Sequence, residues 1–192
     1  MKILVTGFSS FPGVEVNPCE EVVAWIAENY PSNVLQSVIL PVSYMRSIEM
    51  LVQCIESFSP DVVIEFGVSS RAKGLKLESM SYNSRNAQIP DVDGVLCVHE
   101  SIESRLSHGM VNKTKWQINK MFEYLRERCD IPLEISNDPG RYVCNNIYWK
   151  TMNDFPNIPT IFIHIPPLTQ NNRASLIQSV GVLLDWTLCN PQ

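Results

Sequence analysis

Patterns typical of strands and of helices alternate along most of this 192-residue chain. Residues 61–67 form a strand pattern that is apolar enough for the centre of a parallel sheet. Because right-handed crossovers place the connecting helices on both faces of such a sheet, the alternation predicts an α/β fold. We expect one three-layer α/β/α domain over residues 1–192, with a twisted, mostly parallel sheet and helices on both faces.

The predicted elements are placed by their periodicity and by the residues at their ends. Strand patterns cover residues 1–8, 34–42, 61–67, 133–136 and 160–165. Helical patterns begin near Pro18, after Ser43, before Ile118, at Asn145 and near Asn171. From about residue 69 to about residue 112 the periodicity fails, apart from short strands expected within residues 75–82. A loop of that length in a compact domain is usually functional.

The charge and the cysteines argue against several classes of function. The net charge is -5 at pH 7, and the lysines and arginines do not cluster as phosphate binding requires, so we expect no nucleic-acid partner. The six cysteines include no Cys-x-x-Cys pair, and His99 and His108 are isolated, so we expect no metal and no cofactor. No run approaches the roughly 18 apolar residues that span a bilayer. These features predict a cytoplasmic protein that does not bind membranes.

Cys144 is the leading candidate for a reactive residue. Pro139 and Gly140 end the strand pattern before it, and a helix pattern follows from residue 145, so Cys144 should lie in the first helical turn. Unpaired N–H groups and partial positive charge at a helix start stabilise a thiolate and can hold an oxyanion. A free cysteine is more often a small buried apolar residue. His164, late in the strand pattern 160–165, is the candidate base, although a lone strand histidine usually has a structural role.

The candidate residues follow strands, and ligands of parallel sheets bind beyond the carboxyl ends of the strands. Phe8 and Phe11 follow the first strand, Cys144 follows its own, and His164 ends another. Glu78 is expected in the loop beyond the strand at 61–67. A carboxylate normally orients a catalytic histidine. By composition alone Glu78, Glu65 and Asp91 are equivalent candidates for that role.

The chain resembles the pyroglutamyl peptidase I family of cysteine peptidases, also called pyrrolidone-carboxylate peptidases, nearly from end to end. The resemblance is carried by an ordered set of short motifs, none of which is decisive alone. They are Val5-Thr6-Gly7-Phe8, Phe11, Asn17-Pro18, Leu40-Pro41-Val42, Gly67-Val68-Ser69, Glu78, Asn83, Ile89-Pro90-Asp91, Gly94, Gly140-Arg141-Tyr142-Val143-Cys144-Asn145 and Ile163-His164-Ile165-Pro166.

This resemblance implies removal of N-terminal pyroglutamate from peptides through an acyl-enzyme. It implies Cys144 as nucleophile, His164 as base and acid, and Glu78 as the orienting carboxylate. It further implies that Phe11 and Tyr142 flank the lactam ring with Phe8 close behind, and that backbone groups near Val68 bind the lactam. A flat, neutral ring suits aromatic walls and a few hydrogen bonds.

One position departs from the family pattern. Gln88 stands before Ile89-Pro90-Asp91 where many bacterial members have arginine, which removes a cation from the neighbourhood of the oxyanion. Arg85 or Arg71 could reach the same space. Two other functions stay open: a related thiol amidase for another blocked or cyclic acyl group, and a non-catalytic binding domain that retains the pocket. Val95, Leu96 and Val98 could form the interface of a homo-oligomer.

Overall fold

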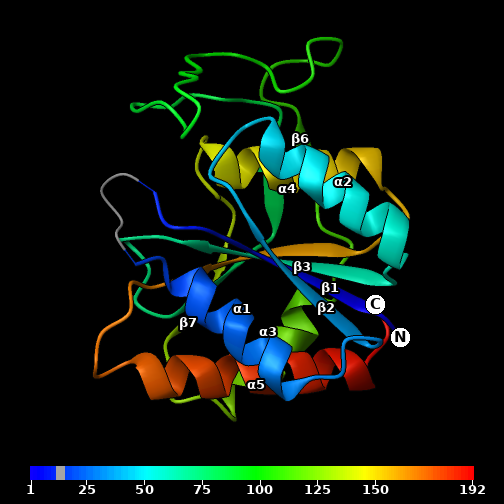
Figure 1. Ribbon diagram of the computed structural model, residues 1–192, viewed down its shortest axis with the longest axis vertical. Coiled ribbons are helices and arrows are strands. Elements are labelled where there is room, and N and C mark those ends of the chain that lie inside the picture. Colours follow the sequence, from blue (N-terminus) through cyan, green and yellow to red (C-terminus); the bar gives the residue numbers. More distant parts are fainter. Residues whose placement is uncertain (12–15) are drawn as a thin grey trace.

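The computed structural model describes residues 1–11 and 16–192, with a central sheet between two layers of helices (Figure 1). Its strands are β1 (Ile3–Phe8), β2 (Leu35–Leu40), β3 (Val62–Val68), β4 (Leu75–Glu78), β5 (Met80–Tyr82), β6 (Val111–Lys113), β7 (Leu133–Ser136) and β8 (Thr160–Ile165). Its helices are α1 (Pro18–Asn29), α2 (Arg46–Phe58), α3 (Ile118–Arg126), α4 (Val143–Asp154) and α5 (Arg173–Cys189).

The main sheet has six strands in the order β2-β1-β3-β8-β4-β7. The strands β1, β2, β3 and β8 run parallel to one another, and β4 pairs antiparallel with β8 and parallel with β7. A separate antiparallel pair joins β5 to β6. The sheet is therefore mostly parallel, as the alternating sequence pattern predicted.

Two hydrophobic clusters fill the spaces on either side of the sheet. Helices α1, α3 and α5 cover one face, and α2 and α4 cover the other (Figure 1). Because side chains alternate along a strand, Phe66 of β3 joins the first cluster and Val63 joins the second. The three layers confirm the predicted α/β/α architecture.

The direction of two strands corrects the sequence analysis. Glu78 does not lie in a loop: it is the last residue of β4, which runs against β8. Residues 69–74 between β3 and β4 are too few for the crossover of about a dozen residues that a parallel connection requires, so the chain reverses. Because β7 is parallel to β4, the strand before Cys144 also runs against β8. The carboxyl-end rule therefore holds for Phe8, Phe11 and His164, and it is wrong for Glu78 and Cys144.

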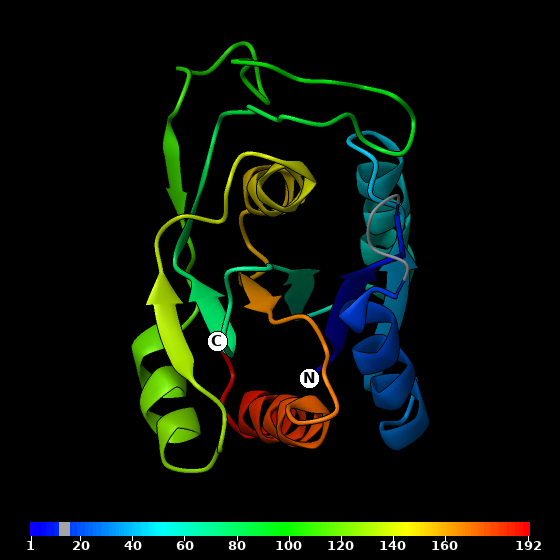
Figure 2. The same cartoon turned by 90° about the vertical axis from the view of Figure 1, so that its left-hand side faces the viewer.

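Two element ends also differ from the expected ones. The strand predicted at 34–42 stops at Leu40, because Pro41 has no N–H to continue the ladder. The helix predicted from residue 145 begins at Val143. The irregular stretch predicted after residue 69 contains β4, β5 and β6 and, between β5 and β6, a long segment that passes over the outer side of α4 (Figure 2).

Candidate active site

Cys144 is the second residue of α4 and therefore lies in its first turn, as the sequence predicted. The turn before it is held by Asp138, whose Oδ1 accepts hydrogen bonds from the Gly140 amide (3.2 Å) and the Arg141 guanidinium (2.6 Å). Gly140 has a φ of 81°, which glycine adopts without steric cost. Tyr142, the N-cap residue, supplies no side-chain cap. The first N–H groups of α4 therefore remain available to a ligand.

His164 and Glu78 form a buried pair on the face of the sheet that α4 covers. The Nδ1 atom of His164 lies 2.8 Å from the Oε1 atom of Glu78, whose side chain is fully buried. His164 lies opposite Lys76 in the β4–β8 ladder, so Glu78 is its diagonal neighbour, two residues further along the strand. A carboxylate only accepts hydrogen bonds, so Nδ1 carries the proton and Nε2 is left as the free acceptor.

The other two candidate carboxylates have different partners. Glu65 is fully buried, and its Oε1 accepts a 2.6 Å hydrogen bond from Thr151 Oγ1. Burial raises the pKa of Glu65 to about 8, although that hydrogen bond lowers it. Asp91 accepts three backbone hydrogen bonds, from the amides of Tyr44, Asp93 and Val95. Among the three acids that composition left equivalent, only Glu78 contacts His164.

The environment of Cys144 favours the neutral thiol. Burial raises the pKa of Cys144 above its ordinary value, and Cys19, Glu78 and Glu65 contribute to the increase. The backbone amide of Cys144 lowers the pKa, and burial outweighs it. The helix start therefore acts in the expected direction, towards the thiolate, but its effect on the pKa is smaller than that of burial. A base must remove the proton, and Cys144 and His164 line the same cavity of about 400 Å³.

A smaller, mostly apolar pocket of about 60 Å³ adjoins this cavity. It brings together all four residues that the sequence analysis assigned to the substrate, which are Phe8, Phe11, Val68 and Tyr142. Asn17, Val42, Val143 and Cys144 complete the described lining. Val68, Tyr142 and Cys144 line both spaces. Cys144 therefore lies at the junction of an apolar pocket and a larger, more polar cavity.

The aromatic walls of the small pocket are held by the surrounding structure. Phe8 is 3% exposed and belongs to the hydrophobic cluster under α4, so it is both a core residue and a pocket residue. The Tyr142 hydroxyl donates to the Pro90 carbonyl (2.9 Å), and its ring contacts Tyr44 edge to face at 5.7 Å. These contacts fix the Tyr142 ring beside the thiol.

Two residues that line the small pocket from outside α4, Asn17 and Val42, were not singled out as site residues from the sequence. Asn17 is the N-cap of α1, since its Oδ1 accepts a hydrogen bond from the Cys19 amide at 3.0 Å. Val42 was interpreted as the end of a strand. In the sequence, the only indication that either residue belongs to the site is the family motif that contains it, Asn17-Pro18 or Leu40-Pro41-Val42.

The two arginines that could replace a cation at position 88, Arg85 and Arg71, have different surroundings in the structure. Gln88 is exposed and is not among the described lining residues. The Arg85 Nε atom donates to Asn146 Oδ1 (2.8 Å), and its guanidinium lies over the Tyr44 ring, behind the site. Arg71 lines the 400 Å³ cavity.

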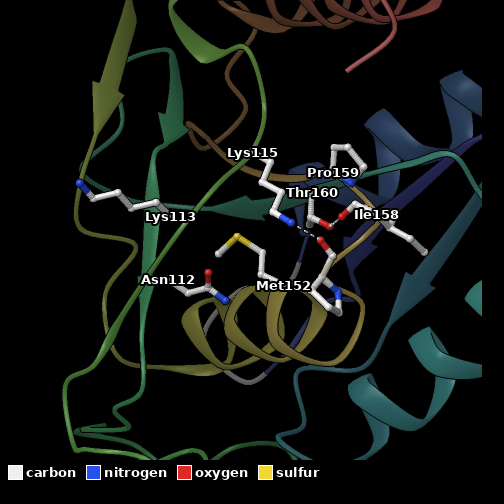
Figure 3. A pocket seen from close by; sticks show the side chains of 8 residues that line it. Asn112, Lys113, Lys115, Met152, Ile158, Pro159 and Thr160 are labelled. Carbon is white, nitrogen blue, oxygen red and sulfur yellow. Dashed lines mark hydrogen bonds between the residues drawn. The ribbon is translucent and has the colours of Figure 1, made fainter.

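A second hollow lies at the far end of α4, around Met152 and Thr160 (Figure 3). Its volume is about 20 Å³, enough for about one water molecule. The Lys115 ammonium at its rim donates to the Pro156 carbonyl (2.6 Å). The hollow is too small for a substrate, and its described lining contains no cysteine and no histidine, so we assign the chemistry to the cavity at Cys144.

Residues 1–11 and 16–192 contain no group of three or more His, Cys, Asp or Glu side chains arranged to hold a metal ion. In the same ranges no helix is both long enough and apolar enough to cross a bilayer.

Comparison with known proteins gives one consistent family. A family model described as pyroglutamyl peptidase matches residues 1–180. A pyrrolidone-carboxylate peptidase of Lactobacillus acidophilus is 32% identical over 170 residues, covering 86% of this chain and 84% of that protein. One from Lactobacillus helveticus is 30% identical over 186 residues, covering 95% and 92%. The fold is similar to that of a mutant pyrrolidone carboxyl peptidase from P. furiosus, with a TM-score of 0.86, 24% identity and 100% coverage of both chains.

Proposed function

Because the chain belongs to the pyroglutamyl peptidase family of hydrolases, we propose that it removes N-terminal pyroglutamate from peptides with Cys144, His164 and Glu78 as its catalytic triad. The observation that carries this proposal is the 2.8 Å contact of the buried Glu78 with His164, which lines the same cavity as Cys144. Glu78 leaves the Nε2 atom of His164 free to accept the thiol proton.

The small pocket suits the pyroglutamyl ring. Phe8, Phe11 and Tyr142 offer aromatic surface to a flat, neutral lactam, and Val68 ends β3 beside them. The described lining of this pocket contains no carboxylate to hold a free amino terminus. We therefore assign the ring to the small pocket, with the Val68 backbone available to its polar atoms.

The reaction follows from these positions in two steps. Nε2 of His164 takes the proton from Sγ of Cys144 as the sulfur attacks the carbonyl carbon after the ring, and the oxyanion faces the N–H groups at the start of α4. His164 then gives its proton to the leaving amine, and the C–N bond breaks to leave a thioester. A water molecule, deprotonated by His164, attacks the thioester, and the Cys144 thiolate leaves and recovers the proton. Glu78 stabilises the imidazolium in each step.

Three further expectations, on domain organisation, cellular compartment and oligomeric state, accompany this proposal. Residues 1–192 would form one catalytic domain. The six cysteines are free thiols, which suits a reducing compartment such as the cytoplasm. Val95, Leu96 and Val98 are exposed in the chain, by 42%, 49% and 49%, as an interface between copies requires. Light scattering at working concentration measures the oligomeric state, and a monomer would contradict that last expectation.

The test of the substrate class is a comparison of chromogenic amides with the purified, reduced protein. We expect rapid hydrolysis of the pyroglutamyl amide and little hydrolysis of the prolyl and acetyl-alanyl amides. Prolyl amide has the same ring size but carries a charged amine that the described pocket does not neutralise. Faster hydrolysis of the acetyl-alanyl amide would favour a different thiol amidase, and no hydrolysis of any amide would favour a binding domain.

A further inference from the structure

The cavity that receives the leaving peptide can be identified from the proposed function. The small pocket takes the ring on one side of Cys144, and His164 must face the leaving amine to protonate it. His164 lines the 400 Å³ cavity and is not in the small pocket. The residues after pyroglutamate therefore lie in the larger cavity.

This cavity has an excess of positive charge on a protein of net charge -5. Its charged lining residues are Arg71, Lys76 and Asp138. The Asp138 carboxylate is neutralised by Arg141 at 2.6 Å. Glu134 lies 3.7 Å from the Lys76 ammonium and is 61% exposed, so this pair is loose. No carboxylate among residues 1–11 and 16–192 lies within ion-pair distance of Arg71.

Both cations are close in the fold to the reacting centre. Lys76 lies opposite His164 in the β4–β8 ladder and on the same face of the sheet. Arg71 lies three residues after Val68, which lines the ring pocket. An extended peptide advances by about 3.3–3.6 Å per residue, so its first residues after the scissile bond pass these side chains.

We propose that Arg71 and Lys76 form a carboxylate-recognition site for the leaving peptide, which makes acidic pyroglutamyl peptides the preferred substrates. This inference rests on the proposed function. The carboxylate can come from a glutamate or aspartate side chain soon after the ring, or from the C-terminus of a very short peptide. Both sources present the same planar anion to the Arg71 guanidinium.

The test measures kcat/KM for two matched pairs of substrates. One pair compares pyroglutamyl-glutamyl-alanine amide with pyroglutamyl-glutaminyl-alanine amide, and the other compares pyroglutamyl-alanine with its amide. For partly exposed charges we expect the anionic member to react about three to five times faster at low ionic strength, with the ratio falling as salt is added. The pair with the larger ratio identifies the source of the carboxylate.

Variants distinguish recognition of the substrate carboxylate from a general loss of enzyme activity. The double variant Arg71→Gln/Lys76→Gln should bring both ratios to about one, and Arg71→Lys with Lys76 intact should keep part of the preference. Lys73→Gln is the matched control, because Lys73 is exposed in the same connection and lines only the neighbouring cavity. It should leave both ratios unchanged.

The possible outcomes are distinct. Equal kcat/KM values within both pairs, or a preference that survives in the double variant, would overturn the inference and leave the proposed function standing. No cleavage of any of the four peptides by the unaltered protein would overturn both.

Discussion

The Nδ1 atom of His164 and the Oε1 atom of Glu78 lie 2.8 Å apart, although they come from antiparallel strands and from positions 86 residues apart in the chain. The second carboxylate oxygen, Oε2, is buried and has no hydrogen-bond partner among the described residues. A buried carboxylate with one partner depends on that partner. The contact therefore fixes the orientation of the imidazole ring.

Replacing Glu78 with glutamine tests this contact. Glu78→Gln keeps the shape but removes the charge that stabilises the imidazolium, so we expect kcat to fall roughly 10²- to 10⁴-fold. The measurement is kcat for the pyroglutamyl amide, with circular dichroism to confirm the fold. A fall of less than about threefold would exclude an electrostatic role for Glu78.

Glu65 should make stability depend on pH. Its pKa is raised in the folded protein to about 8 from an ordinary value of 4.5, so the folded state binds the proton more tightly than the unfolded state. The contribution of Glu65 to the free energy of unfolding is fully present below pH 4.5 and is lost as pH rises through about 8. Between these two pH values the free energy of unfolding falls by about 1.4 kcal/mol per pH unit.

The variant Glu65→Gln removes this titration and should flatten that part of the curve. The measurement is urea unfolding of both proteins from pH 4.5 to pH 8. Their free energies of unfolding should diverge as pH rises, in favour of the variant. Two parallel curves would show that Glu65 titrates normally.

Gly67 should tolerate no side chain. A Cβ added there would lie 2.6 Å from Phe162 Cζ and 3.0 Å from Cys144 Sγ. Gly67→Ala must therefore displace the Phe162 ring or the thiol, and we expect a loss of about 1–3 kcal/mol of stability together with most of kcat. Gly181→Ala, in α5 beside Trp25, is the control that should keep kcat. Normal turnover in Gly67→Ala would mean that the thiol is not held against β3.

Two variants of Tyr142 distinguish the contact of its aromatic ring with the substrate from the hydrogen bond that positions the ring. Tyr142→Phe loses only the hydrogen bond to the Pro90 carbonyl, so we expect KM to rise about two- to fivefold with kcat nearly unchanged. Tyr142→Ala also loses the aromatic wall and should raise KM further. The measurement is steady-state kinetics of both variants. Equal KM values for the two would show that the Tyr142 ring does not contact the substrate.

The sequence predicted the layers and the places of Cys144 and His164 in the fold because both depend on local patterns. The buried strand β8 and the helix after Gly140 were visible in periodicity and turn residues, and they place His164 and Cys144. Strand direction leaves no comparable pattern. The reversal of β4, and with it the position of Glu78, follows from the short connection after β3.

Two features of the site depend on packing that no single segment encodes. Glu65, Glu78 and Asp91 are equivalent in composition, and only the register of β4 against β8 brings Glu78 to His164. The helix start at Cys144 predicted a stabilised thiolate. It does lower the pKa of the thiol, but burial, which no local pattern encodes, raises that pKa by more. The resemblance to a family supplied Glu78 where local reasoning left three choices.

The most direct test of the account is hydrolysis of pyroglutamyl-aminomethylcoumarin by the reduced protein, by Cys144→Ser and by Cys189→Ser. Cys189 is an exposed thiol at the end of α5, far along the chain from the cavity residues, and serves as the matched control. We predict turnover by the unaltered protein and by Cys189→Ser, and a loss of nearly all turnover in Cys144→Ser with the fold retained. Turnover that persists in Cys144→Ser would contradict the assignment of the nucleophile.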